Sequence, residues 1–249
     1  MATALTHRNA ELKIVTNAEA LYRTAAEEFS HAAESAIAER GRFCVALSGG
    51  NTPKGAYAEL AAQKKDSLPW EKIYVFFGDE RHVPPEDSES NYRMARESLL
   101  SKVPIPEENV HRVLAELPAP AAAVQYEMDI RSFLHLPGGV WPRFDLIFLG
   151  LGDDGHTASL FPGSPALAES SRIVVANFVE KFNGYRITFT YPVLNHADKV
   201  IFLVSGRSKA QVVKEIFTSR EAAYPALGVR PENGKLLWIA DKDAASLLA

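Results

Sequence analysis

The sequence predicts a single α/β domain in which a mainly parallel central sheet is flanked by helices. Short apolar runs, such as residues 43–47, alternate with longer alanine-rich segments of helical spacing, and no repeat or block of charge interrupts this alternation. Continuous apolar runs are typical of parallel strands that are covered on both faces. With 249 residues the chain can form one large core, so we expect a single domain over residues 1–249.

The expected strands are apolar runs bounded by glycine, proline or charged residues. In chain order they span residues 12–15, 43–47, 73–77, 110–113, 146–149, 173–179, 185–190, 200–204 and 236–240. The segment Lys-Phe-Asn-Gly at 181–184 separates two of these strands and is typical of a hairpin turn. That pair is therefore expected to be antiparallel.

The expected helices span residues 18–40, 88–100, 119–134, 191–196 and 241–248, and two more begin near Pro53 and after Gly206. Residues 18–40 repeat apolar side chains at helical spacing, as a helix that covers a sheet does. Pro53 suits a first helical turn with Thr52 as its cap, and Ser90 is a possible cap for residues 88–100.

Composition and charge exclude several classes of protein. Apolar residues make up 47% and charged residues 23% of the chain, which are ordinary values for a globular protein. The net charge of -4 argues against nonspecific nucleic-acid binding, so the partner is expected to be a small molecule. Residues 1–11 are polar and no apolar run is long enough to span a membrane, so we expect a cytoplasmic protein without a membrane partner. The single cysteine, Cys44, is predicted to be a buried, unreactive thiol.

The stretch from Phe144 to Pro165 contains the strongest candidates for chemistry. Its apolar strand is followed by three glycines and by Asp153, Asp154 and His156. Glycines allow the backbone to turn sharply and approach a ligand, and titratable groups stand where the strand ends. A metal site is not expected from these three side chains, because the stretch has no H-E-x-x-H motif and no second histidine.

Residues 150–155 also match the dinucleotide pattern G-x-G-x-x-G. That motif requires a helix that runs on from the third glycine and an acidic residue about twenty positions later. Here Pro162 and Pro165 leave little room for a helix, two carboxylates in the loop would repel a pyrophosphate, and residues 173–176 are apolar. We therefore expect no nicotinamide cofactor, and no other cofactor is indicated.

Two further loops are predicted to bind an anion. The residues that follow strand 43–47 and open a helix are Ser48, Gly49, Gly50, Asn51 and Thr52. Backbone N–H groups at a helix N-terminus bind phosphate well, although a plain glycine turn with a capping threonine is the structural alternative. Ser205-Gly206 repeats this arrangement and is followed by Arg207 and Lys209, which are either part of the same anion site or plain surface charges.

A charged cluster, Asp79, Glu80, Arg81 and His82, follows strand 73–77 at the sheet edge where α/β proteins bind ligands. The planar guanidinium of Arg81 could clamp a phosphate. The two carboxylates could instead be ion-pair partners of Arg81.

Four segments taken together resemble 6-phosphogluconolactonases over nearly the whole chain, from about Leu12 to Ala240. They are Ser48-Gly-Gly-Asn-Thr-Pro, Phe77-Gly-Asp-Glu-Arg-His-Val-Pro-Pro, Gly150-Leu-Gly-Asp-Asp-Gly-His-Thr-Ala-Ser-Leu-Phe-Pro-Gly-Ser, and Arg186-Ile-Thr with Ser205-Gly-Arg-Ser-Lys-Ala. The resemblance implies a modified Rossmann-like domain shared with glucosamine-6-phosphate deaminases. It also implies hydrolysis of 6-phospho-D-glucono-1,5-lactone in the oxidative branch of the pentose phosphate pathway.

Two alternatives stay open beside the lactonase. The related deaminases share motifs that match Asp79 and Asp154-Gly-His, but they carry a glutamate that supports the histidine where this chain has Phe161. The fold also serves as a noncatalytic sugar-phosphate sensor in some transcription regulators, which usually carry a helix-turn-helix that the first forty residues here do not suggest. The missing carboxylate favours the lactonase.

The lactonase resemblance assigns roles to particular side chains. His156 is expected to be the general base, because a neutral imidazole accepts a proton near neutrality, and Asp154 or Asp153 would orient its ring. The substrate phosphate would lie on the loop 48–52, helped by three cations, and further contacts to the substrate are expected at the sheet edge. The cations are Arg81, Arg186 and Lys209. The further contacts to the substrate are expected from Gly155 and Asp79. Asp79 would either contact hydroxyl groups of the substrate or hold Arg81 in place. A monomer is favoured.

Overall fold

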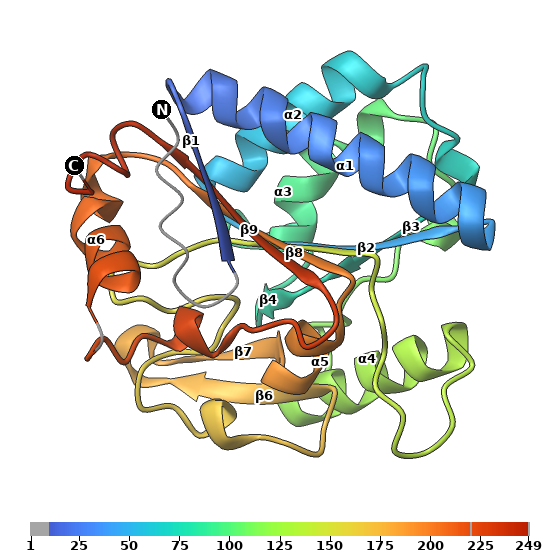
Figure 1. The fold of residues 1–249 in the computed structure, drawn as a ribbon. Coiled ribbons are helices and arrows are strands. Elements are labelled where there is room, and N and C mark those ends of the chain that lie inside the picture. The colour runs from blue at the N-terminus through green and yellow to red at the C-terminus, as the bar shows by residue number, and fades with distance from the viewer. Residues whose placement is uncertain (1–9, 220, 249) are drawn as a thin grey trace.

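The computed structural model describes residues 10–219 and 221–248, and within them six parallel strands form a central sheet in the order β1-β9-β8-β5-β2-β3 (Figure 1). These strands are β1 (Ala10–Val15), β2 (Phe43–Leu47), β3 (Ile73–Phe77), β5 (Leu146–Leu149), β8 (Lys199–Val204) and β9 (Lys235–Asp241). Each neighbouring pair is parallel, so the carboxyl ends of all these strands meet at one edge. The predicted fold class is confirmed.

Helices cover both faces of this sheet because the buried strands alternate their side chains between two cores. In β2, Phe43, Val45 and Leu47 pack with α1 (Ala18–Arg40) and α2 (Asn51–Lys64) on one face. Cys44 and Ala46 belong to the core on the opposite face. That core includes α4 (Ala119–Phe133), α5 (Tyr191–His196) and α6 (Ala210–Thr218) (Figure 1).

A second, smaller sheet lies below the carboxyl edge in Figure 1 and has the antiparallel order β4-β7-β6. It consists of β4 (Asp79–Arg81), β6 (Val174–Val179) and β7 (Gly184–Phe189). The predicted hairpin of β6 and β7 is confirmed. Three of the four residues in the charged cluster after β3, Asp79 to Arg81, form β4 itself, so their positions are fixed by strand pairing with β7 and not by a free loop.

Three local predictions are wrong. Residues 110–113 form only a single bridge, between Val110 and Val75, because the chain turns away at Val113, whose carbonyl accepts the N–H of Ala115. In the segment 241–248, Asp241 still belongs to β9 and residues 242–247 form consecutive turns, since a segment this short gains too few hydrogen bonds to nucleate a helix.

The third error concerns the start of α2, where Gly50 occupies the cap position and Thr52 already lies in the helix without a capping hydrogen bond. By contrast, Ser90 caps α3 (Asn91–Ser98): its Oγ accepts the N–H of Arg93 at 3.1 Å. None of the helices within residues 10–219 and 221–248 has the length and hydrophobicity of a membrane span.

Candidate active site

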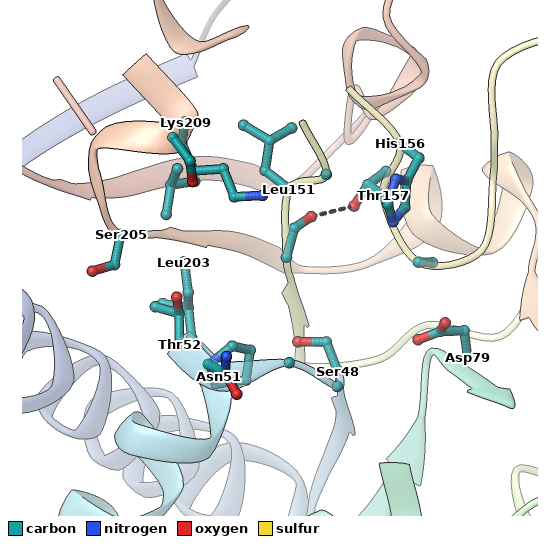
Figure 2. A pocket seen from close by; sticks show the side chains of 18 of the residues that line it. Ser48, Asn51, Thr52, Asp79, Leu151, His156, Thr157, Leu203, Ser205 and Lys209 are labelled. Atoms are coloured by element: carbon teal, nitrogen blue, oxygen red, sulfur yellow. Dashed lines mark hydrogen bonds between the residues drawn. The ribbon is translucent and has the colours of Figure 1, made fainter. Parts of the chain in front are cut away.

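A pocket of about 420 Å³ opens at the carboxyl edge of the central sheet (Figure 2). Loops that follow β2, β5 and β8 form its walls, and β4 closes one side. The predicted site residues that line it are Ser48, Gly49, Gly50, Asn51, Thr52, Asp79, Arg81, His156 and Lys209. Asp154, Gly155 and Arg186 lie outside the lining. The topology therefore gathers most of the predicted residues around one cavity.

One end of the pocket is formed by the start of α2. Gly50 adopts a φ of 104°, a backbone conformation that favours glycine, and so turns the chain into the helix. The N–H groups of Asn51 and Thr52 belong to the first turn and have no carbonyl partner within the helix. The Oγ of Ser48 is buried and has no hydrogen-bond partner among the described residues. Unpaired donors at a helix N-terminus form an anion-binding site.

A second turn reaches the same end of the pocket from β8. Gly206, with a φ of 95° and a ψ of 151°, repeats the conformation of Gly50, with 104° and 168°, and a turn of 3-10 helix follows it. Asp241 fixes this turn by accepting the Gly206 N–H at 3.1 Å. Lys209 lines the pocket and also pairs with Asp153 at 2.5 Å, whereas Arg207 is not part of the lining. Figure 2 shows Lys209 and Thr52 on the same side of the pocket.

His156 lies on the other side of the pocket, with Asp79 (Figure 2). Its Nδ1 is 2.5 Å from Oδ1 of Asp154, while Asp153 points to Lys209 instead. Partial burial raises the pKa of Asp154, but the hydrogen bond and the charge of His156, with the hydrogen bond from Lys181, outweigh it and lower that pKa to about 2. Asp154 is therefore an anion near neutrality, Nδ1 carries the proton, and Nε2 is left as the basic nitrogen.

Two of the three glycines in the loop after β5, Gly152 and Gly155, are explained by close packing. A Cβ on Gly152 would lie 2.0 Å from Nδ1 of His156, so only glycine lets the ring approach. Gly155 has a φ of 73°, and a Cβ there would meet the ring of Tyr224 at 2.2 Å. The chain then continues through a bridge between Thr157 and Leu160 and not into a helix. The G-x-G-x-x-G match therefore lacks the helix that a pyrophosphate needs.

The carboxylates of β4 do not pair with Arg81, so that structural alternative is wrong. Asp79 accepts hydrogen bonds from Ser159 Oγ at 2.6 Å and from Asn91 Nδ2 at 3.2 Å, and it lines the pocket. The side chain of Glu80, which belongs to β4, is buried against the start of α3, where its Oε1 accepts the N–H of Asn91 at 2.7 Å. Glu80 thus supports a helix, because its oxygens are occupied by backbone donors.

Arg81 and Arg186 face each other across β4 and β7. The Nη1 of Arg81 donates to the carbonyl of Glu89 at 2.8 Å, and the guanidinium of Arg186 lies 5.0 Å above the ring of Phe182. Burial and the neighbouring charge of Arg81 lower the pKa of Arg186. Arg186 therefore lies beside the pocket, and its part in binding stays a prediction.

Sequence reasoning missed two residues that contact the histidine pair. Phe161 stacks on His156 with ring centroids 4.1 Å apart, and Nζ of Lys181 lies 3.2 Å from the second oxygen of Asp154. In the sequence, Phe161 stands where the deaminases have a glutamate, but nothing in the sequence indicates that its ring covers the imidazole. Lys181 comes from the β6–β7 turn, and no spacing rule relates that turn to the loop after β5. The described residues contain no cluster of three or more histidine, cysteine or acidic side chains suited to a metal.

Comparison with known proteins places this chain in a family. The family model described as glucosamine-6-phosphate isomerases/6-phosphogluconolactonase matches residues 16–238. The 6-phosphogluconolactonase of Synechocystis sp. is 47% identical over 216 residues, which cover 86% of this chain and 88% of that protein. The 6-phosphogluconolactonase of Rattus norvegicus is 42% identical over 213 residues, which cover 84% and 82%.

A solved structure agrees with these sequence matches. The 6-phosphogluconolactonase from Trypanosoma brucei superimposes with a TM-score of 0.86 at 30% identity, covering 98% of this chain and all of that one. The chain therefore belongs to the family of glucosamine-6-phosphate isomerases and 6-phosphogluconolactonases, and the resemblance to 6-phosphogluconolactonases that its motifs indicated is confirmed.

Proposed function

We propose that this pocket hydrolyses 6-phospho-D-glucono-1,5-lactone to 6-phospho-D-gluconate, in the oxidative branch of the pentose phosphate pathway. Identities of 42% and 47% to 6-phosphogluconolactonases over most of the chain support the reaction. One observation carries the assignment of the site: His156, whose Nδ1 is paired with Asp154, lines the same pocket as the N-terminus of α2. The sequence further predicts a monomeric, cytoplasmic enzyme. Sedimentation equilibrium would test whether the protein is a monomer.

The two ends of the pocket suit the two ends of the substrate. The donors of residues 48–52 and Lys209 are proposed to hold the phosphate, and His156 then stands near the lactone carbonyl at the opposite end (Figure 2). Charge-assisted hydrogen bonds to the phosphate provide binding energy far from the reacting carbon, which orients that carbon for attack. Asp79, fixed by Ser159 and Asn91, is proposed to contact sugar hydroxyls.

Hydrolysis needs one proton to move twice. Nε2 of His156 takes a proton from water as the water oxygen bonds to the lactone carbonyl carbon, and the anion of Asp154 stabilises the resulting imidazolium. The bond between that carbon and the ring oxygen then breaks, and the ring oxygen receives the proton from Nε2. The product is a carboxylic acid that ionises in water, and the scheme uses only side chains of this chain.

The deaminase alternative requires a carboxylate where Phe161 stands. The ring of Phe161 stacks on His156, so the position that holds the glutamate in the deaminase motif touches the imidazole here, but it has no group that can exchange a proton. Release of ammonia from glucosamine 6-phosphate would support the deaminase.

The decisive experiment generates the lactone in place and compares acid release with the uncatalysed blank. We expect His156→Ala to lose about 10² to 10⁴ in kcat, the usual contribution of a general base, while its affinity for 6-phosphogluconate is retained. His31→Ala is the matched control, because His31 is exposed on α1 and takes no part in the pocket. Wild-type turnover in the His156 variant would refute the base assignment, and binding without turnover in the wild type would favour the sensor.

A further inference from the structure

The turn between β6 and β7 contacts the His156–Asp154 pair on the side of Asp154, which lies outside the lining of the pocket. This turn comprises residues 180–183, and Asn183 closes it in the left-handed conformation with a φ of 46°. From it, Nζ of Lys181 reaches Oδ2 of Asp154 at 3.2 Å. The two oxygens of Asp154 therefore have separate partners, because Oδ1 lies 2.5 Å from Nδ1 of His156.

Aromatic packing fixes the same turn against the imidazole. Phe161 lies between His156 and the turn: its ring stacks on the imidazole at 4.1 Å and meets the ring of Phe182 edge-on at 5.7 Å. The guanidinium of Arg186 covers Phe182 at 5.0 Å. Lys181 is thus held at Asp154 by the packing of its neighbour and not only by its own ion pair.

The charges around His156 come from four elements. Asp154 lies on its own loop and Lys181 on the β6–β7 turn, Asp79 and Arg81 on β4 line the same pocket, and Lys209 of the turn after β8 is paired with Asp153. Among the described residues, Lys181 is the cation that contacts the carboxylate bound to the imidazole. Its charge opposes protonation of His156, whereas the charge of Asp154 favours it.

We propose that Lys181 is a positioning residue for the His156–Asp154 pair: it holds Oδ2 of Asp154 so that Oδ1 faces the imidazole, and its charge keeps the imidazole unprotonated to lower pH. This inference rests on the proposed function of His156 as the base. It gives the β6–β7 turn a role in extending lactone hydrolysis into weakly acidic solution.

The test compares Lys181→Met with Lys181→Arg by the pH dependence of kcat/KM. Because exposed ion pairs are weak, we expect the methionine variant to raise the pKa of the acid limb by about half a unit, which lowers kcat/KM about threefold at pH values well below that pKa. The arginine variant keeps the charge and should restore the wild-type profile. Lys235→Met removes another exposed lysine, at the amino end of β9 and far from the pocket, and should leave the profile unchanged.

An NMR titration of the His156 imidazole provides a readout that does not depend on turnover. Its pKa should rise in Lys181→Met by the same amount as the acid limb, and circular dichroism should show that the variant is folded, since Lys181 is 58% exposed. An unchanged or lowered imidazole pKa, or an arginine variant as altered as the methionine one, would overturn the inference. Absence of lactone hydrolysis in the wild type would instead refute the proposed function, and the titration would still measure the effect of Lys181.

Discussion

Replacing Asp154 by asparagine tests how the histidine is activated. Asparagine keeps the shape of the side chain but removes its charge, and its amide can donate to Nδ1, which would place the imidazole proton on Nε2. In that tautomer Nε2 cannot accept a proton from water. We therefore expect Asp154→Asn to lose at least about 10²-fold in kcat, the lower end of what general-base catalysis contributes.

The structure also gives the size and sign of the change in pH dependence. The pKa of Asp154 falls from 3.8 to about 2 in the folded protein. Because the side chain is 31% exposed, solvent screening reduces this coupling to about one pH unit, or ~1.4 kcal/mol. Coupling between the two groups is reciprocal, so loss of the carboxylate should move the acid limb of kcat/KM down by up to about one pH unit.

The same pKa fixes the effect of Asp154 on stability. A carboxyl whose folded-state pKa lies below its unfolded value stabilises the fold above the unfolded pKa of 3.8, and that contribution disappears as the pH falls through about 2. Asp154→Asn should therefore be less stable than the wild type at neutral pH by about 1 kcal/mol, with the difference vanishing in acid.

The assay measures initial rates of acid release from about pH 5 to about pH 8, with an uncatalysed blank at each pH. Asp154→Asn and Lys181→Met are expected to move the acid limb in opposite directions, which separates an electrostatic effect from general damage to the site. A wild-type kcat, or an acid limb that stays in place, would refute the role of Asp154.

Two further predictions concern other parts of the molecule. Lys209→Ala should raise KM about 10- to 100-fold with kcat nearly unchanged, because it removes a charged hydrogen bond to the phosphate, and steady-state kinetics with an unchanged KM would exclude Lys209 from phosphate binding. Burial raises the pKa of Cys44 to about 12, with a smaller effect from Asp145, so the folded protein should not react with a thiol-specific disulfide reagent at about pH 8 until it is unfolded. Rapid labelling of the folded protein would show that the thiol is accessible.

The chain order of strands and helices could be predicted because it depends on local patterns. Apolar runs between glycines and charges indicated β2, β5 and β8, since a strand buried on both faces needs apolar side chains throughout. The wrong secondary-structure predictions also concern short segments, a strand at residues 110–113 and a helix at residues 241–248. In segments this short, a few turn hydrogen bonds determine the conformation as readily as the intrinsic propensity of the residues does.

The location of the site followed from topology. In a parallel sheet the carboxyl ends of the strands share one edge, which predicts that the segments at Ser48, Asp79, His156 and Lys209 meet there, and all four residues line the pocket. Their individual roles remain predictions that the kinetic experiments address. Thr52 was misplaced as a cap because the left-handed Gly50 supplies the turn that a capping side chain would otherwise stabilise.

The sequence by itself determined the fold class, the family and the loops that line the pocket, because each depends on residues adjacent in the chain. Only the tertiary structure decided which carboxylate meets the imidazole, how Glu80 is used, and that Lys181 reaches the histidine pair. These facts depend on side-chain direction, which strand pairing and the packing of distant segments fix. A turn formed by residues 180–183 approaches Asp154 only because β6 and β7 lie against the loop after β5, and no local pattern encodes that contact.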